Sequence, residues 1–370
     1  MSTALIGKRL KALRDERDLD QDAVAEMLGL KSRQIVSNIE TGERKVKADE
    51  LLALVEKLNV DMDYFTDPYR IVGEGSFSWR QTGRTVVELK AYEAMAGSWI
   101  AMFRHEAPRV GRHALLRRPK LPLTKQSSYE DAMAEGERVA EELALGEVPA
   151  ALLPEAMERD FGILVLMVDA IEGVSGAACR LPELDAVLVN RNEVAGRRHF
   201  DLAHELFHIM TWDEMPPDYS EDAIGFGRKR SRVEQLADNF AAALLMPARV
   251  IARFGKWAGM GAQELAARIN AVADKLLVTA QALKWRLLAL GLLARAVALN
   301  IADDLLRNNG REKGEDETPP PFSHAFMDVI GKAIDRGFVS RRRAARQLGI
   351  DVYELGDVFR AHQLPVPEGL

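Results

Sequence analysis

His204-Glu205-Leu206-Phe207-His208 is the stretch that decides the fold of this chain. The two histidines are four residues apart, so on a helix they lie on one face and both imidazoles can bind one metal ion. Glu205 then points towards the ion, where it can serve as the general base for a water molecule. The chain has seven histidines, so a random match has a probability on the order of one in a hundred. An ordinary amphipathic helix with two histidines on its face is the alternative interpretation of the pentapeptide alone.

A catalytic zinc site usually has three protein ligands and keeps one position open for water. Glu234 is the candidate for the third ligand, since it opens a strongly helical segment that Pro247 stops. Asp238 lies one helical turn later on the same face, where it can hydrogen-bond a ligand histidine. Without the histidine pair, Glu234 would be interpreted as a solvated surface carboxylate. With it, His204, His208 and Glu234 predict one Zn²⁺ per chain, and another divalent metal would also suit these ligands.

The composition is that of a soluble globular protein with room for two or three domains, with 370 residues, 47% hydrophobic and 29% charged. Its one cysteine, Cys179, excludes an internal disulfide framework and is typical of a reducing cytoplasm. No signal-peptide pattern opens the chain and no apolar run could span a membrane, so we expect a cytoplasmic protein without a membrane partner. The net charge of −6 does not suggest a nucleic-acid binder overall, but basic clusters such as Arg341-Arg342-Arg343 leave local binding surfaces open.

The first 65 residues predict short helices with tight turns. Asp20 is the expected N-cap of a second helix and Gly29 its C-terminal cap. A third helix should follow Ser32 and end before Thr41-Gly42, and a fourth should cover 48–58. This is the helix-turn-helix pattern, in which the second helix of the motif enters the major groove of double-stranded DNA. A helical packing or dimerisation module that does not bind DNA is the alternative.

Two segments of this region, Gln21–Ala25 and Ser32–Arg44, resemble the XRE family of phage-repressor-like DNA-binding domains. The resemblance covers nearly the whole region, and its Ser-x-Ile-Glu-x-Gly ending at 37–42 is fairly specific. It implies that four side chains face base edges or phosphates and that two others contact the DNA backbone: the first group is Ser32, Arg33, Gln34 and Asn38, the second Gln21 and Arg44. Arg, Gln and Asn are the residue types that make bidentate base contacts, so the chemistry agrees.

Two short apolar runs, 163–168 and 186–189, predict buried strands before the histidine helix. In zincin peptidases a strand in this position lies beside the cleft, so we expect the second run to pair with extended substrate. Tyr219 and His199 are candidates for stabilising an oxyanion, and the sequence does not choose between them. His199 also suits a structural role at the start of the helix.

Four segments together resemble the ImmA/IrrE family of metallopeptidases: Ser175–Ala177, Val189-Asn190, Arg197–Glu205 and Glu234–Pro247. The likeness spans about residues 160–250. It implies metal ligands His204, His208 and Glu234, with Glu205 as base and proton shuttle. The typical target in that family is a transcriptional repressor, often of the XRE type. Asp238 stands where Asn is frequent, which leaves metal binding intact because a carboxylate also orients a ligand histidine.

The fold class we predict is mainly α with a small β-sheet (α+β). The expected order is a helix-turn-helix domain at 1–68, a linker at 69–85, a zincin-like ImmA/IrrE-type domain at 86–260, a helical extension at 261–307, a second linker at 308–321 and a C-terminal helical region at 322–370. In the last region Ser340 should cap a helix and Gly349 should end it. A second helix-turn-helix and a solvated basic face explain this region equally well.

Two functions follow from these predictions. The first is a DNA-binding transcriptional regulator with a zinc-dependent endopeptidase domain that cleaves a repressor or partner protein. The second is a DNA-binding regulator or antitoxin whose peptidase-like domain senses a metal or ligand without catalysis. Intact His204, Glu205, His208 and Glu234 favour the first, because a sensor could lose Glu205 without penalty. A homodimer is compatible with both.

Overall fold

The computed structural model of the chain describes residues 3–113, 116–222, 231–307 and 318–369. It consists of two compact units, Met1–Gly75 with Lys90–Arg112, and Ser76–Leu89 with His113–Leu370. Each unit buries a hydrophobic core of its own. The predicted domain boundaries stay a prediction.

The first unit is helical throughout its described part. It contains α1 (Thr3–Glu16), α2 (Gln21–Met27), α3 (Arg33–Glu40), α4 (Ala48–Lys57), α5 (Met62–Thr66) and most of α6 (Val86–Arg109). Asp20 caps α2 by accepting a hydrogen bond of 2.7 Å from the Ala23 N–H, and Gly29 follows that helix with φ of 64°, as predicted. The core consists of apolar side chains from α1 to α5, among them Leu10, Val24, Val36, Ile39, Leu54 and Phe65.

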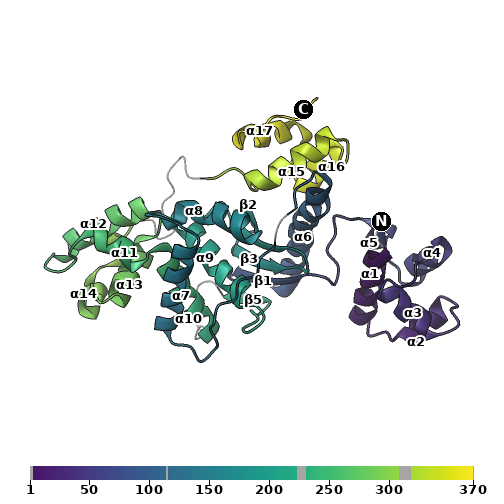
Figure 1. Cartoon of the computed structure of the whole chain (residues 1–370), viewed down its shortest axis with the longest axis horizontal. Coiled ribbons are helices and arrows are strands. Elements are labelled where there is room, and N and C mark those ends of the chain that lie inside the picture. The colour runs from purple at the N-terminus through teal and green to yellow at the C-terminus, as the bar shows by residue number, and fades with distance from the viewer. Residues whose placement is uncertain (1–2, 114–115, 223–230, 308–317, 370) are drawn as a thin grey trace. The chain divides into compact units, whose positions relative to one another are not determined.

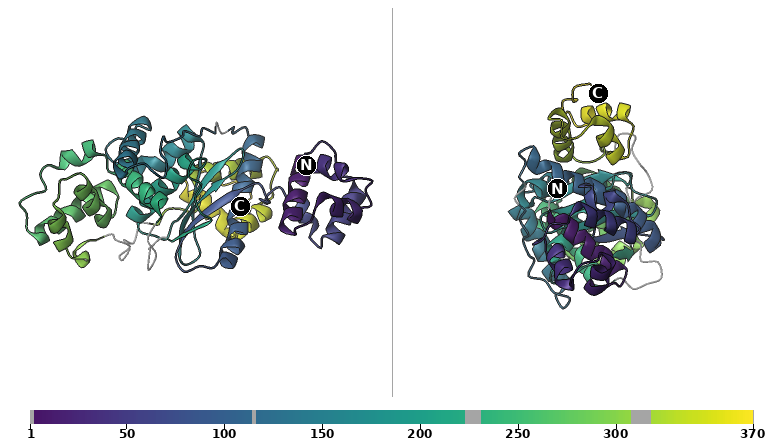
Figure 2. Two further views of the ribbon diagram at one scale, coloured as in Figure 1. Left: turned by 90° about the horizontal axis from the view of Figure 1, so that it is seen from below. Right: turned by 90° about the vertical axis from the view of Figure 1, so that its right-hand side faces the viewer.

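The second unit contains a five-stranded mixed sheet in the order β2-β4-β3-β1-β5. Its strands are β1 (Ser76–Gln81), β2 (Leu164–Val168), β3 (Val174–Arg180), β4 (Asp185–Asn190) and β5 (Ser220–Asp222), and they lie side by side in Figure 1 and in the left view of Figure 2. β4 runs parallel to β2 and antiparallel to β3, while β1 runs antiparallel to β3 and parallel to β5. The two strands that the sequence predicted are β2 and β4.

Two predictions about strands are wrong. β4 is hydrogen-bonded to β2 on one side and to β3 on the other, so its backbone cannot pair with an extended substrate. Its nearly continuous buried run is typical of a central strand covered on both faces. Ser76–Gln81 forms β1, although the sequence assigned it to the linker at 69–85. It is a strand because it pairs with residues of β3 about a hundred positions away in the chain. The nearby Gly and Ser residues suggest a linker and give no sign of this distant pairing.

Helices cover the sheet. The second unit has α7 (Tyr129–Glu142), α8 (Pro149–Ala156), α9 (Ala195–Thr211), α10 (Arg232–Leu245), α11 (Ala248–Ile251), α12 (Ala262–Leu276), α13 (Ala280–Ala289) and α14 (Arg295–Asn300), with short helical turns at Met157–Phe161, Ala252–Phe254 and Asp303–Leu305. α9 packs against β3, β4 and α10, and α10 packs against α7. Gly136 permits the last contact, since a Cβ there would lie 2.4 Å from the carbonyl oxygen of Phe240. Cys179 is buried in β3.

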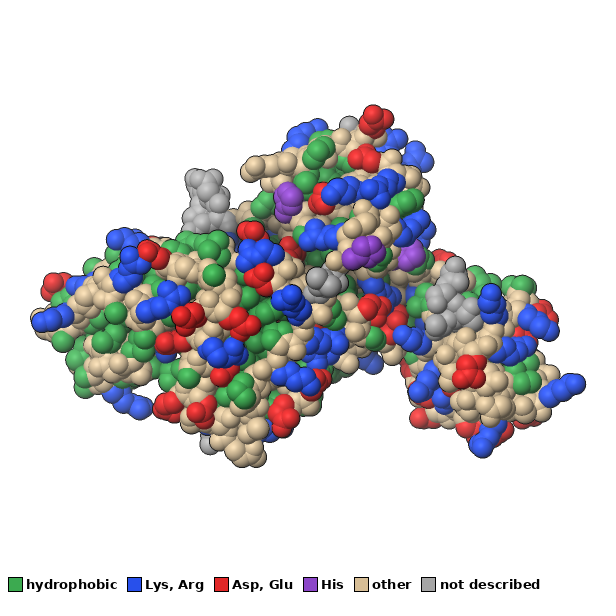
Figure 3. Space-filling view, in the orientation of Figure 1, with side chains coloured by type: hydrophobic (Ala, Val, Ile, Leu, Met, Phe, Trp, Pro, Cys, Tyr) green, Lys and Arg blue, Asp and Glu red, His purple; other side chains and the backbone are tan. Residues whose placement is uncertain are grey.

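The C-terminal helices are α15 (His324–Asp335), α16 (Arg341–Leu348) and α17 (Val352–Ala361). Ser340 accepts a hydrogen bond of 3.2 Å from the Arg343 N–H at the start of α16. Gly349 ends that helix with φ of 73°, so both predicted caps are confirmed. Basic side chains are exposed on α16 (Figure 3). Of the predicted linker at 308–321, residues 308–317 lie outside the described part.

The predicted fold class is confirmed: the chain is mainly helical with one small sheet. Among the described residues, no helix has both the length and the apolar character needed to span a membrane.

Candidate metal centre

The face of α9 that turns inward carries a row of polar side chains in an otherwise apolar surrounding. Asp201, His204, Glu205 and His208 are all at most 1% exposed. Their positions at i, i+3, i+4 and i+7 place them on one face of the helix. Burying so many polar groups is costly unless each has a partner, so the row indicates a site that these residues build together.

Three atoms that could bind a metal ion converge from α9 and α10. The Nε2 atoms of His204 and His208 are 3.1 Å apart, and the Glu234 carboxylate lies 3.2 Å from the first and 3.3 Å from the second. A tetrahedral zinc ion with bonds of about 2.0–2.1 Å holds its ligand atoms about 3.3 Å from one another. The three donors therefore fit a zinc ion, and all three residues are buried.

Asp238 holds His204 from the other side of the ring. Its carboxylate lies 3.0 Å from His204 Nδ1, so Nδ1 carries the proton. The lone pair of Nε2 then points to where the three candidate ligand atoms converge. This is the hydrogen bond that the spacing of Glu234 and Asp238 on α10 predicts.

Glu205 lies over the sheet beside Gly176 of β3. A Cβ at position 176 would be 2.9 Å from the carbonyl oxygen of Leu188 and 4.0 Å from Glu205 Oε1. Glycine therefore lets β3 approach β4 closely while the carboxylate of Glu205 packs against the strand. Glu205 is next to the first ligand histidine but is not one of the three converging donors.

Arg80 of β1 adds a buried cation to this cluster. Its Nη1 donates a hydrogen bond of 2.8 Å to His204 Nε2, and its Nε lies 2.9 Å from an oxygen of Asp201. The guanidinium also lies 4.0 Å from Glu234 and 3.9 Å from Asp238. Arg80 thus contacts both a candidate ligand and the carboxylate that orients it.

The electrostatics of the cluster favour positive charge. Burial acts to lower the pKa of Arg80, but Asp201, Asp238, Glu205 and Glu234 together raise that pKa above its ordinary value. Burial likewise acts to raise the pKa of the Glu234 carboxyl, but His204 and His208 lower it well below its usual range. Burial and Arg80 lower the pKa of His204, whereas Glu234 and Asp238 outweigh them and raise it. Four carboxylates around the Arg80 guanidinium are compensated better when a divalent cation joins them.

Of the two proposed oxyanion donors, His199 has another role in the structure, and the proposed role of the Tyr219 hydroxyl stays a prediction. His199 Nδ1 hydrogen-bonds the Leu277 carbonyl oxygen at 2.8 Å, and burial lowers the pKa of its imidazole. That contact joins α9 to the end of α12, which agrees with a structural role. Tyr219 precedes β5, and its carbonyl oxygen accepts a hydrogen bond of 2.9 Å from the Trp79 N–H, one residue before Arg80.

Sequence reasoning missed Asp201 and Arg80. Asp201 could have been found, because it precedes His204 by three residues and so shares its helix face. Arg80 could not, because its neighbours in the site lie 121 to 158 positions further along the chain. No local pattern marks such a contact.

The predicted DNA-contact residues gather at α2, α3 and the turn after α3, but they do not form one cluster. Gln34 donates a hydrogen bond of 2.8 Å to Asn38 on the exposed part of α3, and Ser32 and Arg33 are exposed at its start. Gln21 instead turns inward and donates to Glu40 at 2.8 Å. Arg44 forms a bidentate ion pair of 2.7 and 2.8 Å with Glu50; DNA contact by all six residues stays a prediction.

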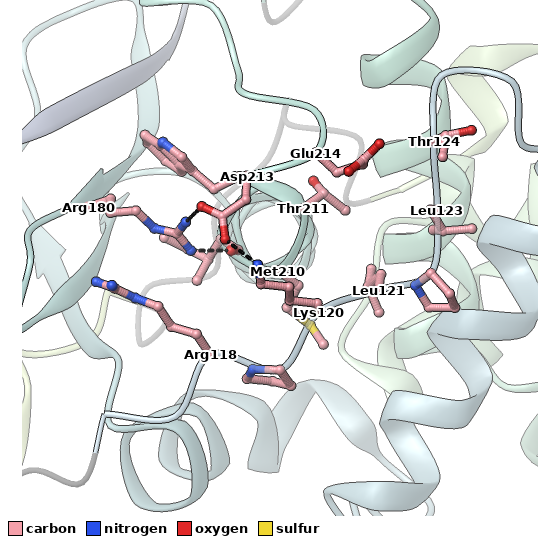
Figure 4. A pocket seen from close by; sticks show the side chains of 14 residues that line it. Arg118, Lys120, Leu121, Leu123, Thr124, Arg180, Met210, Thr211, Asp213 and Glu214 are labelled. Carbon is pink, nitrogen blue, oxygen red and sulfur yellow. Dashed lines mark hydrogen bonds and ion pairs between the residues drawn. The ribbon is translucent and has the colours of Figure 1, made fainter.

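A cavity of about 370 Å³ opens at the C-terminal end of α9 (Figure 4). The segment 118–124 lines it together with Arg180 and the end of the helix up to Glu214. Asp213 pairs with Arg180 at 2.8 Å and with Lys120 at 2.7 Å across this cavity. His204, His208 and Glu234 do not line this cavity, so it is separate from the candidate metal centre.

Two family models match the chain. One, described as Helix-turn-helix, matches residues 10–65, and the other, described as IrrE N-terminal-like domain, matches residues 159–287. No curated protein and no solved structure matches it. The two matched segments contain α2 and α3 in the first case and the converging donors in the second.

Proposed function

We propose that this chain, in which a helix-turn-helix domain is joined to an IrrE N-terminal-like domain, is a DNA-binding regulator that also acts as a zinc-dependent endopeptidase on a repressor protein. The observation that carries the proposal is the convergence of His204, His208 and Glu234 within 4.8 Å, with buried Glu205 beside the first of them. A binding site alone would not require that carboxylate.

His204, His208 and Glu234 would hold the metal, and Asp238 would fix the tautomer of His204. When bound, the metal would polarise the scissile carbonyl and make water a better nucleophile at neutral pH. Glu205 would accept the proton of the attacking water and deliver it to the leaving amine. α9 supplies three of these five residues and α10 the other two, so one rigid element sets the relative positions of both histidines and Glu205.

The helix-turn-helix domain gives the activity a location. A peptidase tethered to operator DNA meets DNA-bound repressors at a raised effective concentration. The substrate class that we favour is a repressor with an XRE-type domain, since such repressors are the target that the resemblance to the ImmA/IrrE family implies.

The direct test compares the wild-type chain with Glu205→Gln and a matched control, Glu214→Gln, which changes an exposed glutamate just beyond α9. Each is purified, its zinc content is measured, and it is incubated with XRE-type repressors. All three should carry zinc, and only Glu205→Gln should lose cleavage, by about 10²–10⁴-fold. Equal cleavage by Glu205→Gln would refute the proposed role of this residue.

The second candidate function is a regulator or antitoxin whose metal centre senses without catalysis. The hydrogen bond from Arg80 to His204 Nε2 favours this second function, because it already occupies one of the three atoms that would bind the metal. If the wild type binds zinc and operator DNA, leaves every repressor intact, and changes its DNA affinity with zinc, the sensor is the correct function.

A further inference from the structure

Arg80 competes with the proposed metal for the same atom. A neutral imidazole nitrogen offers one lone pair, and His204 Nε2 uses it to accept from Arg80 Nη1 at 2.8 Å. Asp238 occupies the opposite side of the ring at 3.0 Å from Nδ1, so His204 has no second acceptor position. His204 can therefore serve the guanidinium or a metal ion, but not both at once.

Arg80 also competes for charge. Its guanidinium lies 2.9 to 4.0 Å from Asp201, Asp238 and Glu234, of which Glu234 is the candidate carboxylate ligand. A cation that enters among the three donors brings positive charge within a few ångströms of a second buried positive charge. In a site this dry such repulsion is screened far less than at the surface.

The position of Arg80 is fixed by structure on both sides. Its backbone pairs with Gly176 of β3 and Glu221 of β5, and its Nε is anchored on Asp201 of α9. Arg80 is 5% exposed, so the guanidinium is not one of several surface rotamers. Metal entry then requires a defined movement, in which Nη1 leaves His204 while Asp201 can retain Nε.

We infer that Arg80 is an internal cation that competes with the metal for His204 and for the surrounding carboxylates. Arg80 thereby sets how tightly the centre binds metal. This inference rests on the proposed metal centre and assigns a residue outside it. The strand that carries Arg80 is flanked in the chain by the two segments of the helical unit, Met1–Gly75 and Lys90–Arg112. The competing cation is thus supplied by a segment of the second unit that lies, in the chain, between the two segments of the first.

The test measures zinc affinity of the full chain by competition with a chromophoric chelator. Arg80→Met removes the charge and the hydrogen bond, and we expect zinc to bind at least about tenfold more tightly. Arg80→Lys keeps a positive charge on a shorter side chain, so its zinc affinity should lie between those of Arg80→Met and the wild type. Equal or weaker binding by Arg80→Met, when the wild type binds zinc, would overturn the inference and leave the metal centre standing.

Arg180→Met is the matched control. Arg180 is also an arginine of the sheet, and it ties α9 to β3 through a hydrogen bond of 2.8 Å to the Ile209 carbonyl oxygen near the C-terminal end of the helix, without contacting a nitrogen of His204. Its loss should leave zinc affinity unchanged. An increase like that of Arg80→Met would mean that any loosening of α9 strengthens metal binding, which contradicts competition at His204.

Thermal unfolding provides a second measurement, in case Arg80→Met folds poorly without metal. Removing Arg80 leaves its carboxylates uncompensated, so zinc should raise the unfolding temperature of Arg80→Met more than that of the wild type. A zinc-induced rise no larger than in the wild type argues against the inference. Absence of zinc binding in both proteins would refute the metal centre together with this inference.

Discussion

The exposed face of α3 and the buried face of α9 carry the two sets of residues that suggest a function, and they differ in how those residues are satisfied. On α3, Gln34 donates to its own neighbour Asn38 and Arg33 extends into solvent. On α9, His204 and His208 turn towards Glu234 of another helix, with separations of 3.2 and 3.3 Å.

The difference reflects the size of the partner. A metal ion is surrounded by its ligands, so the chain must bring them together before the ion binds, and burial preserves their geometry. DNA is larger than the domain, and the side chains that bind it remain in water until the duplex replaces that water. The distances within this chain can therefore be compared directly with those that a metal site requires. The contacts of the α3 surface, in contrast, form only when DNA binds.

The largest effect that we expect from a single substitution is the loss of metal in His208→Ala. This change removes one of three donors, and zinc should fall from one ion per chain to nearly none after dialysis. The loss of affinity should exceed the 10–100-fold typical of a residue that only orients a ligand. Elemental analysis of the full-length protein gives the zinc content, and a mobility-shift assay gives the DNA affinity, which should stay unchanged.

His199→Ala is the control for that substitution. His199 belongs to the same helix but hydrogen-bonds the Leu277 carbonyl oxygen, so its loss should leave zinc content intact. Equal loss of zinc in both variants would show that α9 tolerates no histidine replacement, and the contrast between the two faces would lose its support.

Asp238→Ala should have the next largest effect. It removes the hydrogen bond of 3.0 Å to His204 Nδ1 and frees the ring to rotate, so we expect zinc affinity to decrease by about 10–100-fold. Asp238→Asn preserves an acceptor and should lose less. Chelator competition measures both, and an unchanged affinity in Asp238→Ala would mean that packing alone orients His204.

The effect of Arg33→Ala should appear only in DNA binding. If Arg33 contacts a base edge, its removal should cost about 1–3 kcal/mol on an operator selected with the wild-type protein and relax the preference at one base pair. Zinc affinity should stay the same. Lys57→Ala, an exposed cation at the end of α4, is the comparison: a loss as large as that of Arg33→Ala would indicate a general charge effect.

The sequence predicted the three residues that converge between α9 and α10 and the helices that carry the proposed DNA contacts, because their signals are local. Spacing within α9 and α10 predicts which side chains share a face, and the cap residues Asp20 and Ser340 predict where helices begin. Arg80 carries no such signal, since it reaches His204 only through the pairing of β1 with β3. The wrong role for β4 has the same origin: whether a strand is central or at an edge depends on partners elsewhere in the chain.

Arg44→Gln should have the smallest effect. It tests whether Arg44, a predicted DNA contact, stabilises the domain through its ion pair with Glu50. Arg44 hydrogen-bonds Glu50 and thereby lowers the pKa of that carboxyl below its ordinary value of 4.5. The pair therefore stabilises the fold at pH values above 4.5, and this contribution is lost as the pH falls through the lowered pKa. Because the pair is partly exposed, we expect Arg44→Gln to reduce the free energy of unfolding by about 0.2–1 kcal/mol at neutral pH. Urea unfolding should show this difference at pH 7, and the difference should shrink as the pH falls below 4.5 and through the lowered pKa of Glu50. A difference that persists in acid would mean that Arg44 stabilises the turn after α3 through packing, and the residue would then be structural before it is a contact to DNA.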